Sequence, residues 1–141
     1  MAVTISLYNH TSKLFANGEV DLTGLKVVLL NAAGTFTAAN TAYADISANE
    51  VSGNGWDSGG EAVANATVTT VTTNDARLDA DDLSIAASGG DIGPAENAVL
   101  RDATNNKLLA HISFGEAKTA DSGTDFEIVW DSTGIINWTY T

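Results

Sequence analysis

The segment Asp57-Ser58-Gly59-Gly60 is the stretch of this sequence that most resembles the surroundings of a catalytic nucleophile. It matches most of the Gly-Asp-Ser-Gly-Gly signature around the nucleophilic serine of chymotrypsin-like proteases. That chemistry needs a histidine base and an orienting aspartate, delivered by a two-barrel fold. Trp56 precedes the motif, the chain has only 141 residues, and neither His10 nor His111 lies in a matching context. We therefore interpret the motif as a glycine-rich turn leading into a strand, and we expect no catalytic residue and no enzyme.

Acidic residues are concentrated between Asp75 and Asp82, and carboxylate oxygens are ligands that Ca²⁺ prefers. An EF-hand loop places them at alternate positions, with a central glycine for its turn and a glutamate at the end. From Asp79 onward the sequence offers Asp81 and then Leu83, and no glycine stands where the turn requires one. We interpret the run as a solvated turn between strands, with a weak surface ion site as the alternative.

The two histidines, His10 and His111, are about a hundred residues apart, and the sequence contains no cysteine. A transition-metal site needs several nitrogen or sulfur ligands at close spacing. We therefore predict no metal site and no cofactor. His111 precedes Ile112 in an apolar run, so we expect its side chain on the strand face opposite to the core.

The charge of the chain is strongly negative, with 18 acidic and 6 basic residues and a formal net charge of -12. The basic residues are scattered along the sequence: Lys13, Lys26, Arg77, Arg101, Lys107 and Lys118. Phosphate backbones repel such a field and are normally bound by clustered lysine and arginine, so we expect no nucleic-acid partner. Acidity also keeps a protein soluble at high local concentration, which suits a component present in many copies.

Targeting and membrane signals are not evident in the sequence. No stretch approaches the roughly 20 apolar residues of a membrane-spanning helix, so we expect no membrane partner. The segment from Met1 to Tyr8 lacks the basic flank and long apolar run of a secretion signal. We therefore expect the protein to be made and first folded in a cytoplasm.

Size and composition predict a single domain over residues 1–141 that is mostly β. Alanine, threonine, glycine, asparagine and aspartate are abundant, whereas good helix formers rarely occur in periodic runs. One short N-terminal helix is expected over Asn9–Asn17, because Asn9 or Thr11 can cap its start and Gly18 can end it. The continuous apolar run Leu25–Leu30 is typical of a central strand buried on both faces.

The last third of the sequence predicts two β-hairpins. Asn97–Arg101 and Leu108–Phe114 flank one turn-rich segment, and Phe126–Trp130 and Ile135–Tyr140 flank another. Further short strands are expected at Val3–Leu7, within Glu61–Thr73, at Arg77–Leu78 and at Leu83–Ala86. Alternating aromatic residues in the final strands favour two packed layers. We therefore expect a single-domain antiparallel β-sandwich of jelly-roll or immunoglobulin-like type.

Trp56 lies in a glycine-rich segment, where a large apolar side chain has no local core to enter. A loop tryptophan of this kind is either a lid on the protein's own core or an anchor in a partner's pocket. We favour the lid and keep the anchor as the alternative.

Turn and strand motifs follow one another in a recognisable order along nearly the whole chain. They are Lys13-Leu14-Phe15-Ala16-Asn17-Gly18, Asp45-Ile46-Ser47-Ala48-Asn49-Glu50-Val51-Ser52-Gly53, Gly55-Trp56, Gly59-Gly60, Leu78-Asp79-Ala80-Asp81-Asp82, Leu100-Arg101-Asp102 and Trp130-Asp131-Ser132-Thr133-Gly134-Ile135. This series resembles a family of small virion structural proteins from tailed bacteriophages. The sequence departs from the family pattern at Trp56, where tyrosine is more usual, and at Leu83-Ser84-Ile85, where a tryptophan is expected.

The resemblance implies a head decoration, or cement, protein that binds the major capsid protein on the outer surface of the head and stabilises the lattice. It also implies self-association as a homotrimer. Under this hypothesis the expected contact residues are Val3, Ile5, Leu7, Tyr8 and Trp56. Two alternatives stay open: a tail- or fibre-associated structural protein, and a carbohydrate-binding module.

Overall fold

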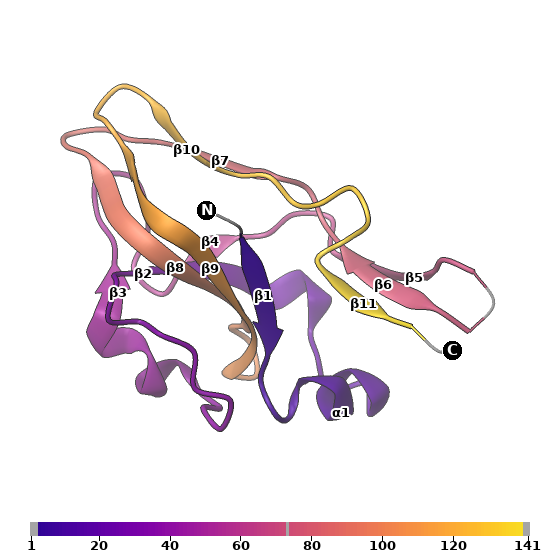
Figure 1. The fold of residues 1–141 in the computed structure, drawn as a ribbon. Helices are drawn as coiled ribbons and strands as arrows, with labels where there is room; N and C mark the ends of the chain where they lie inside the picture. The colour runs from indigo at the N-terminus through magenta and orange to yellow at the C-terminus, as the bar shows by residue number, and fades with distance from the viewer. Residues whose placement is uncertain (1–2, 73, 140–141) are drawn as a thin grey trace.

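The computed structural model describes residues 3–72 and 74–139 (Figure 1). Within them the fold is mostly β, with antiparallel sheets and one short helix, α1 (Thr11–Ala16). This confirms the predicted fold class. Short 3-10 turns occur at Leu22–Gly24, Tyr43–Asp45 and Ser47–Asn49. None of the helices in this part of the chain is long and apolar enough to span a bilayer.

A six-stranded sheet forms one layer of the molecule. Its strands are β1 (Thr4–Leu7), β2 (Leu25–Leu30), β3 (Glu50–Val51), β4 (Glu61–Ala62), β8 (Ile92–Asp102) and β9 (Lys107–Ala120). Their order is β1-β9-β8-β2-β3, and β4 also pairs with β2. The predicted hairpin of the last third is therefore confirmed as β8 and β9, although both strands extend well beyond the expected ranges.

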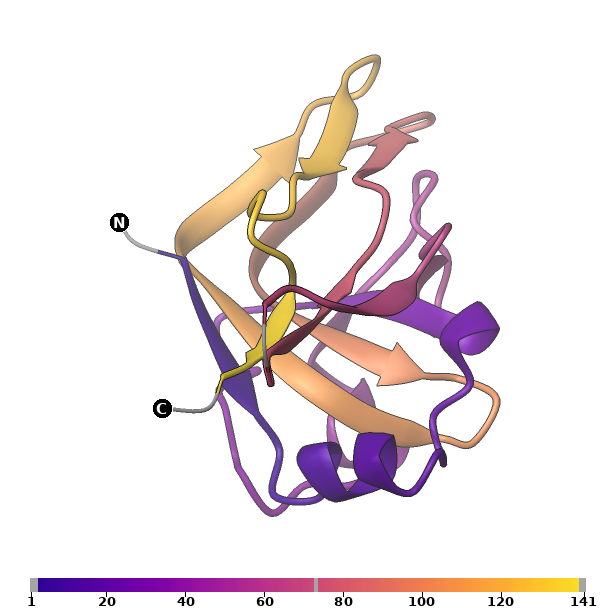
Figure 2. The same ribbon diagram turned by 90° about the vertical axis from the view of Figure 1, so that its right-hand side faces the viewer.

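Two small sheets lie over one face of this layer, as Figures 1 and 2 show. One contains β7 (Leu83–Ala86) and β10 (Asp125–Ile128). The other contains β5 (Thr67–Thr70), β6 (Ala76–Asp79) and β11 (Ile136–Trp138). The result is a layered arrangement consistent with a sandwich, and the finer jelly-roll or immunoglobulin-like topology stays a prediction.

The second predicted hairpin, Phe126–Trp130 with Ile135–Tyr140, is wrong in its pairing. Both segments contain strands, but β10 pairs with β7 and β11 pairs with β6. The turn between them carries the chain from one small sheet to the other, because pairing with earlier strands buries the apolar faces of β10 and β11 over the large sheet. Tyr140 lies outside the described residues.

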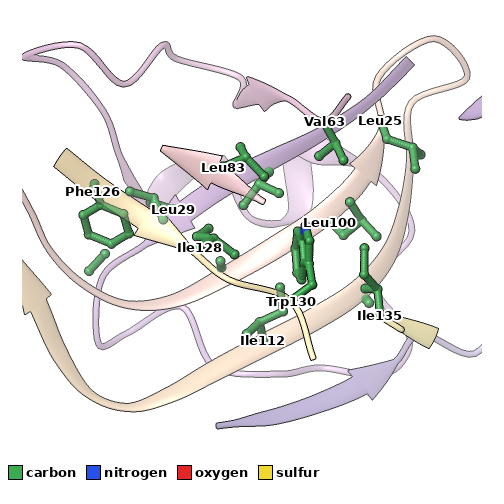
Figure 3. Close-up of a cluster of buried hydrophobic side chains, with 14 of the residues drawn as sticks. Leu25, Leu29, Val63, Leu83, Leu100, Ile112, Phe126, Ile128, Trp130 and Ile135 are labelled. Carbon is green, nitrogen blue, oxygen red and sulfur yellow. The ribbon is translucent and has the colours of Figure 1, made fainter. Parts of the chain in front are cut away.

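The main core fills the space between the large sheet and the two small sheets. Figure 3 shows Leu29, Leu100 and Ile112 of the large sheet in one cluster with Phe126, Ile128 and Trp130. Alternate residues of β10 and the segment after it are buried, which confirms the alternation expected from the sequence. The side chains of this layer therefore fix where β10 lies over β9.

The opposite face of β2 is also buried, which confirms the prediction for Leu25–Leu30. Val28 and Leu30 pack there with Val99 of β8, Leu108 of β9 and Ile46. Ile46 belongs to the segment between β2 and β3, so this irregular segment covers the second face of the sheet. Continuous apolar character was therefore the correct signal for burial on both sides.

Candidate functional site

The serine motif forms a turn, as the sequence predicted. Ser58 donates its hydroxyl hydrogen to Glu50 Oε1 at 2.9 Å, and the Gly59 amide donates to Glu50 Oε2 at 2.8 Å. The Gly59 carbonyl accepts a hydrogen bond from Arg101 Nη1 at 2.7 Å. The turn leads into β4. Its polar groups therefore join the turn to strands β3 and β8 of the large sheet, and the hydroxyl of Ser58 is directed to a carboxylate instead of an imidazole.

Arg101 of β8 holds the same turn, and this structural role was not predicted from the sequence. Its side chain is 8% exposed, and its guanidinium carbon lies 4.6 Å from the centre of the Tyr43 ring. The Tyr43 hydroxyl donates to Glu50 Oε1 at 2.6 Å. Burial, followed by the hydrogen bond to Glu50, raises the pKa of Tyr43 above its usual value. A stacked and hydrogen-bonded arginine of this kind fastens two segments together.

The two histidines lie apart from this turn and bind backbone carbonyls. His10 Nε2 lies 2.6 Å from the Leu108 carbonyl oxygen, and His111 Nε2 lies 2.8 Å from the Gly34 carbonyl oxygen. His111 points away from the main core, as predicted, but the face it occupies is buried too, and the residue is 3% exposed. Burial lowers the pKa of His111 below its usual value, and the bond to Gly34 partly opposes that shift.

The acidic run extends from the residue before β6 to the turn between β6 and β7, and its carboxylates accept hydrogen bonds from backbone and side-chain donors. Asp82 Oδ1 accepts from the Trp130 amide at 2.9 Å, and Asp81 Oδ2 accepts from Asn65 Nδ2 at 2.6 Å. Asp79 Oδ1 accepts from the amide of the residue that follows it at 2.9 Å. No group of three or more potential metal-ligating side chains occurs in residues 3–72 and 74–139. Asp81 and Asp82 are exposed in the turn between β6 and β7, which agrees with the predicted solvated turn, whereas Asp79 is the last residue of β6.

The residues expected at an interface divide into two groups. Val3 and Ile5 are 60% and 40% exposed, and Leu7 is half-buried. Tyr8 and Trp56, by contrast, are 3% and 1% exposed. The ring of Trp56 lies 5.4 Å from that of Phe126 in an edge-on contact, so this tryptophan is a lid on the protein's own core. A partner can therefore reach β1 from outside, whereas Tyr8 and Trp56 are accessible only if the core opens.

An apolar groove of about 590 Å³ adjoins β1. It runs between β1, the part of β9 from Ile112 to its end, and the segment from β10 to Asp131. Its buried lining consists of Ile112, Phe114, Ala120, Phe126, Ile128 and Trp130. Three exposed aliphatic side chains, Val3, Ile5 and the 72% exposed Val129, lie along its margins. Large exposed apolar side chains gathered at a groove are typical of a surface that contacts another molecule.

The charged margin of the groove is acidic. Asp125, Glu127 and Asp131 all line it and are exposed. Hydrogen bonds from Thr133 lower the pKa of Asp131, which keeps that carboxylate ionised. The cation among the lining residues, Lys118, is paired with a neighbouring carboxylate on its own strand, Glu116. The margin therefore presents a net negative charge to anything that enters.

The outer edge of β1 is unpaired among the described residues, because β1 is the terminal strand of the sheet and pairs with β9 alone. The Tyr8 amide donates to the Leu109 carbonyl at 3.4 Å, and the register continues unbroken to Thr4. In an antiparallel pair, successive residues alternately direct their backbone amide and carbonyl groups toward the partner strand and away from it. Ile5 and Leu7 therefore direct their amide and carbonyl groups away from β9.

Comparison with known proteins adds no assignment. A scan of protein-family models, a search of curated proteins and a search of solved structures each find no match to this chain. The candidate site is therefore defined by its own geometry: an unpaired strand edge beside an apolar groove with an acidic margin. The sequence indicated β1, but the contribution of β10 and Val129 depends on packing between distant segments and had no local signal.

Proposed function

We propose that this protein is a virion structural protein of a tailed bacteriophage, and that it decorates the outside of the head by binding the major capsid protein. The observation that carries the proposal is the exposed, unpaired strand β1 beside the apolar groove. The order of motifs along the chain supports the phage assignment. Glu50 and Arg101 hold the Asp57-Ser58-Gly59-Gly60 turn in place by hydrogen bonds. The turn therefore serves the fold, and the proposed binding role is assigned to β1 and the groove.

The groove is large enough to contribute usefully to such binding. Complete burial of Val3, Ile5 and Val129 would remove the remaining exposed parts of three aliphatic side chains from water. At roughly 25 cal/mol per Å² this contributes about 5 kcal/mol, before the cost of association is subtracted. One such contact is modest, so stable attachment depends on many copies and on several contacts in each assembled unit.

The formation of a homotrimer is a second part of the proposal. A closed ring of three subunits would place three copies of the groove on one junction of the capsid lattice and multiply a weak contact. Native mass measured on the purified protein, and again on protein released from heads, tests this part separately from capsid binding.

The experiment that tests the proposal mixes labelled protein with undecorated heads, with intact tails and with a glycan array. Saturable binding to the outer surface of heads is expected, with no comparable signal on tails or glycans. Binding to tails alone would make the protein tail-associated, and binding to glycans alone would make it a carbohydrate-binding module. Either result would contradict the decoration proposal.

A further inference from the structure

The feature that carries a further inference is the combination of a free strand edge with a groove whose margin is acidic. Figures 1 and 2 show β1 at the margin of the large sheet, alongside β9. The final part of β9 separates β1 from β10. Ile5 and Leu7 offer outward amide and carbonyl groups, and Ile5 also contributes its side chain to the groove. Backbone and side-chain contacts are therefore available to the same incoming segment.

We propose that β1 accepts an extended, cationic segment of another protein, which joins the large sheet as a further strand and places apolar side chains in the groove. An unpaired edge recognises extended backbone, and pockets for alternate side chains give selectivity. The identity of the partner as the major capsid protein rests on the proposed function. The chemistry of the segment rests only on β1 and the groove.

The acidic margin of the groove indicates which kind of protein segment would bind there. The margin carries Asp125, Glu127 and Asp131, and Lys118 already has Glu116 as its partner. A second copy of this chain would bring another net charge of -12 against this margin. Lysine or arginine beside the apolar residues of the incoming segment would instead complement it, and such complementarity governs partner choice and association rate. The geometry thus favours a basic strand from a different protein.

The uncharged sequence of β1 also fits an edge that accepts a further strand. The strand Thr4–Leu7 carries no charged residue, and among the described residues no segment pairs with its outer side. Edge strands that must avoid pairing usually carry inward-pointing charges, proline or a bulge. β1 has an unbroken register with β9 across all four of its residues, so its outer edge is regular enough to extend the ladder.

The first test uses undecorated heads and two pairs of variants. Ile5→Pro removes an amide that points away from β9, so it breaks no hydrogen bond within the sheet, whereas Ile5→Val keeps that amide. Glu127→Lys reverses a charge at the groove, and Glu19→Lys makes the same change at an exposed residue outside the residues that line it. Ile5→Pro and Glu127→Lys are each expected to weaken binding about tenfold, with each control within about twofold.

The second test uses the isolated full-length protein and does not depend on heads. A short blocked peptide of alternating valine and lysine is titrated while backbone amide signals are followed by NMR. The largest shifts are expected at Ile5 and Leu7, with Glu127→Lys reducing the affinity. A matched peptide of valine and glutamate is expected not to bind. This measurement also stands if the proline variant fails to fold.

The two tests separate failure of this inference from failure of the proposed function. If wild-type protein binds heads but Ile5→Pro and Glu127→Lys bind equally well, the strand-addition proposal is overturned and decoration stands. If wild-type protein does not bind heads, decoration fails, and the peptide titration decides the inference alone. Shifts away from β1, or no binding of the basic peptide, would overturn it. A self-associated species that Ile5→Pro dissolves would assign the edge to a second copy and would overturn it too.

Discussion

Asp102 is a buried carboxylate on which the end of the β8–β9 hairpin depends. It is 0% exposed at the end of β8. Its Oδ1 accepts from the amides of Thr104 and Asn105 at 3.0 and 3.2 Å. Its Oδ2 accepts from the Asp21 amide at 2.9 Å and from Asn105 Nδ2 at 2.8 Å. One side chain therefore closes the turn after β8 and attaches the segment before β2 to it.

Replacement of this side chain has a calculable cost. Asp102→Ala removes the acceptor of four hydrogen bonds, and each donor that stays buried without a partner costs about 1–3 kcal/mol. All four lie in partly buried surroundings where water can replace some of the lost contacts, so we expect a loss near 4 kcal/mol in the free energy of unfolding. Asp102→Asn keeps the shape and one oxygen but turns an amide group toward donors, and should cost about 2 kcal/mol.

Urea unfolding followed by tryptophan fluorescence measures these losses. Asp121→Ala, at an exposed carboxylate in the segment between β9 and β10, is the matched control and should change the free energy of unfolding by less than about 0.5 kcal/mol. The reasoning would be refuted if Asp102→Ala unfolded at the same urea concentration as the control. It would also be refuted if the asparagine variant were the less stable of the two.

Three further predictions concern other positions. Gly60 has φ +104°, and a Cβ there would lie 2.6 Å from the Val27 carbonyl oxygen, so Gly60→Ala should lower the free energy of unfolding, measured with heat or urea, by several kcal/mol. Gly53 has φ +103° but open space around it, so Gly53→Ala, the control, should lower it by only about 1 kcal/mol through backbone strain. Trp56→Ala should lower the free energy of unfolding by about 3–5 kcal/mol, and a loss under 1 kcal/mol would contradict its role in the core. Burial lowers the pKa of His111 in the folded protein below its usual value, so the unfolded chain binds a proton at this histidine first as pH falls. Stability should therefore be full above pH 6.5 and decline below it, and urea midpoints measured against pH should show a shallower decline in His111→Gln.

The sequence predicted the parts of this fold that local patterns determine. Leu25–Leu30 was identified as a strand buried on both faces because its apolar run is continuous. The helix was expected over Asn9–Asn17 and occupies Thr11–Ala16 within it. The first hairpin was found because a polar turn separates its two apolar strands. In each case the physical cause lies within a few residues of the element.

Pairing between distant strands could not be predicted in the same way. The turn after Trp130 looked like the end of a hairpin, yet β10 pairs with β7 and β11 with β6. A turn signal specifies a change of direction but not the partner, which depends on how apolar faces fit together over the large sheet. The groove was missed for the same reason, since β1 and β10 are brought together only by the complete fold.

The roles of single polar residues were predicted only in part. Turn chemistry correctly explained Asp57-Ser58-Gly59-Gly60, but the buried Arg101 that holds this turn gave no signal in the sequence. Tyr8 was expected at the surface with its neighbours in β1, but it follows the strand and packs with Val99 and Leu108 instead. Strand alternation indicates which face a residue occupies, whereas its burial depends on whether another segment covers that face.

Binding of purified protein to undecorated phage heads tests the central claim most directly. Electron microscopy of the mixed sample should show added density at regular positions on the outer surface of the lattice, and occupancy should saturate with added protein. Heads that remain bare at saturating protein, or density found only on tails, would contradict the account.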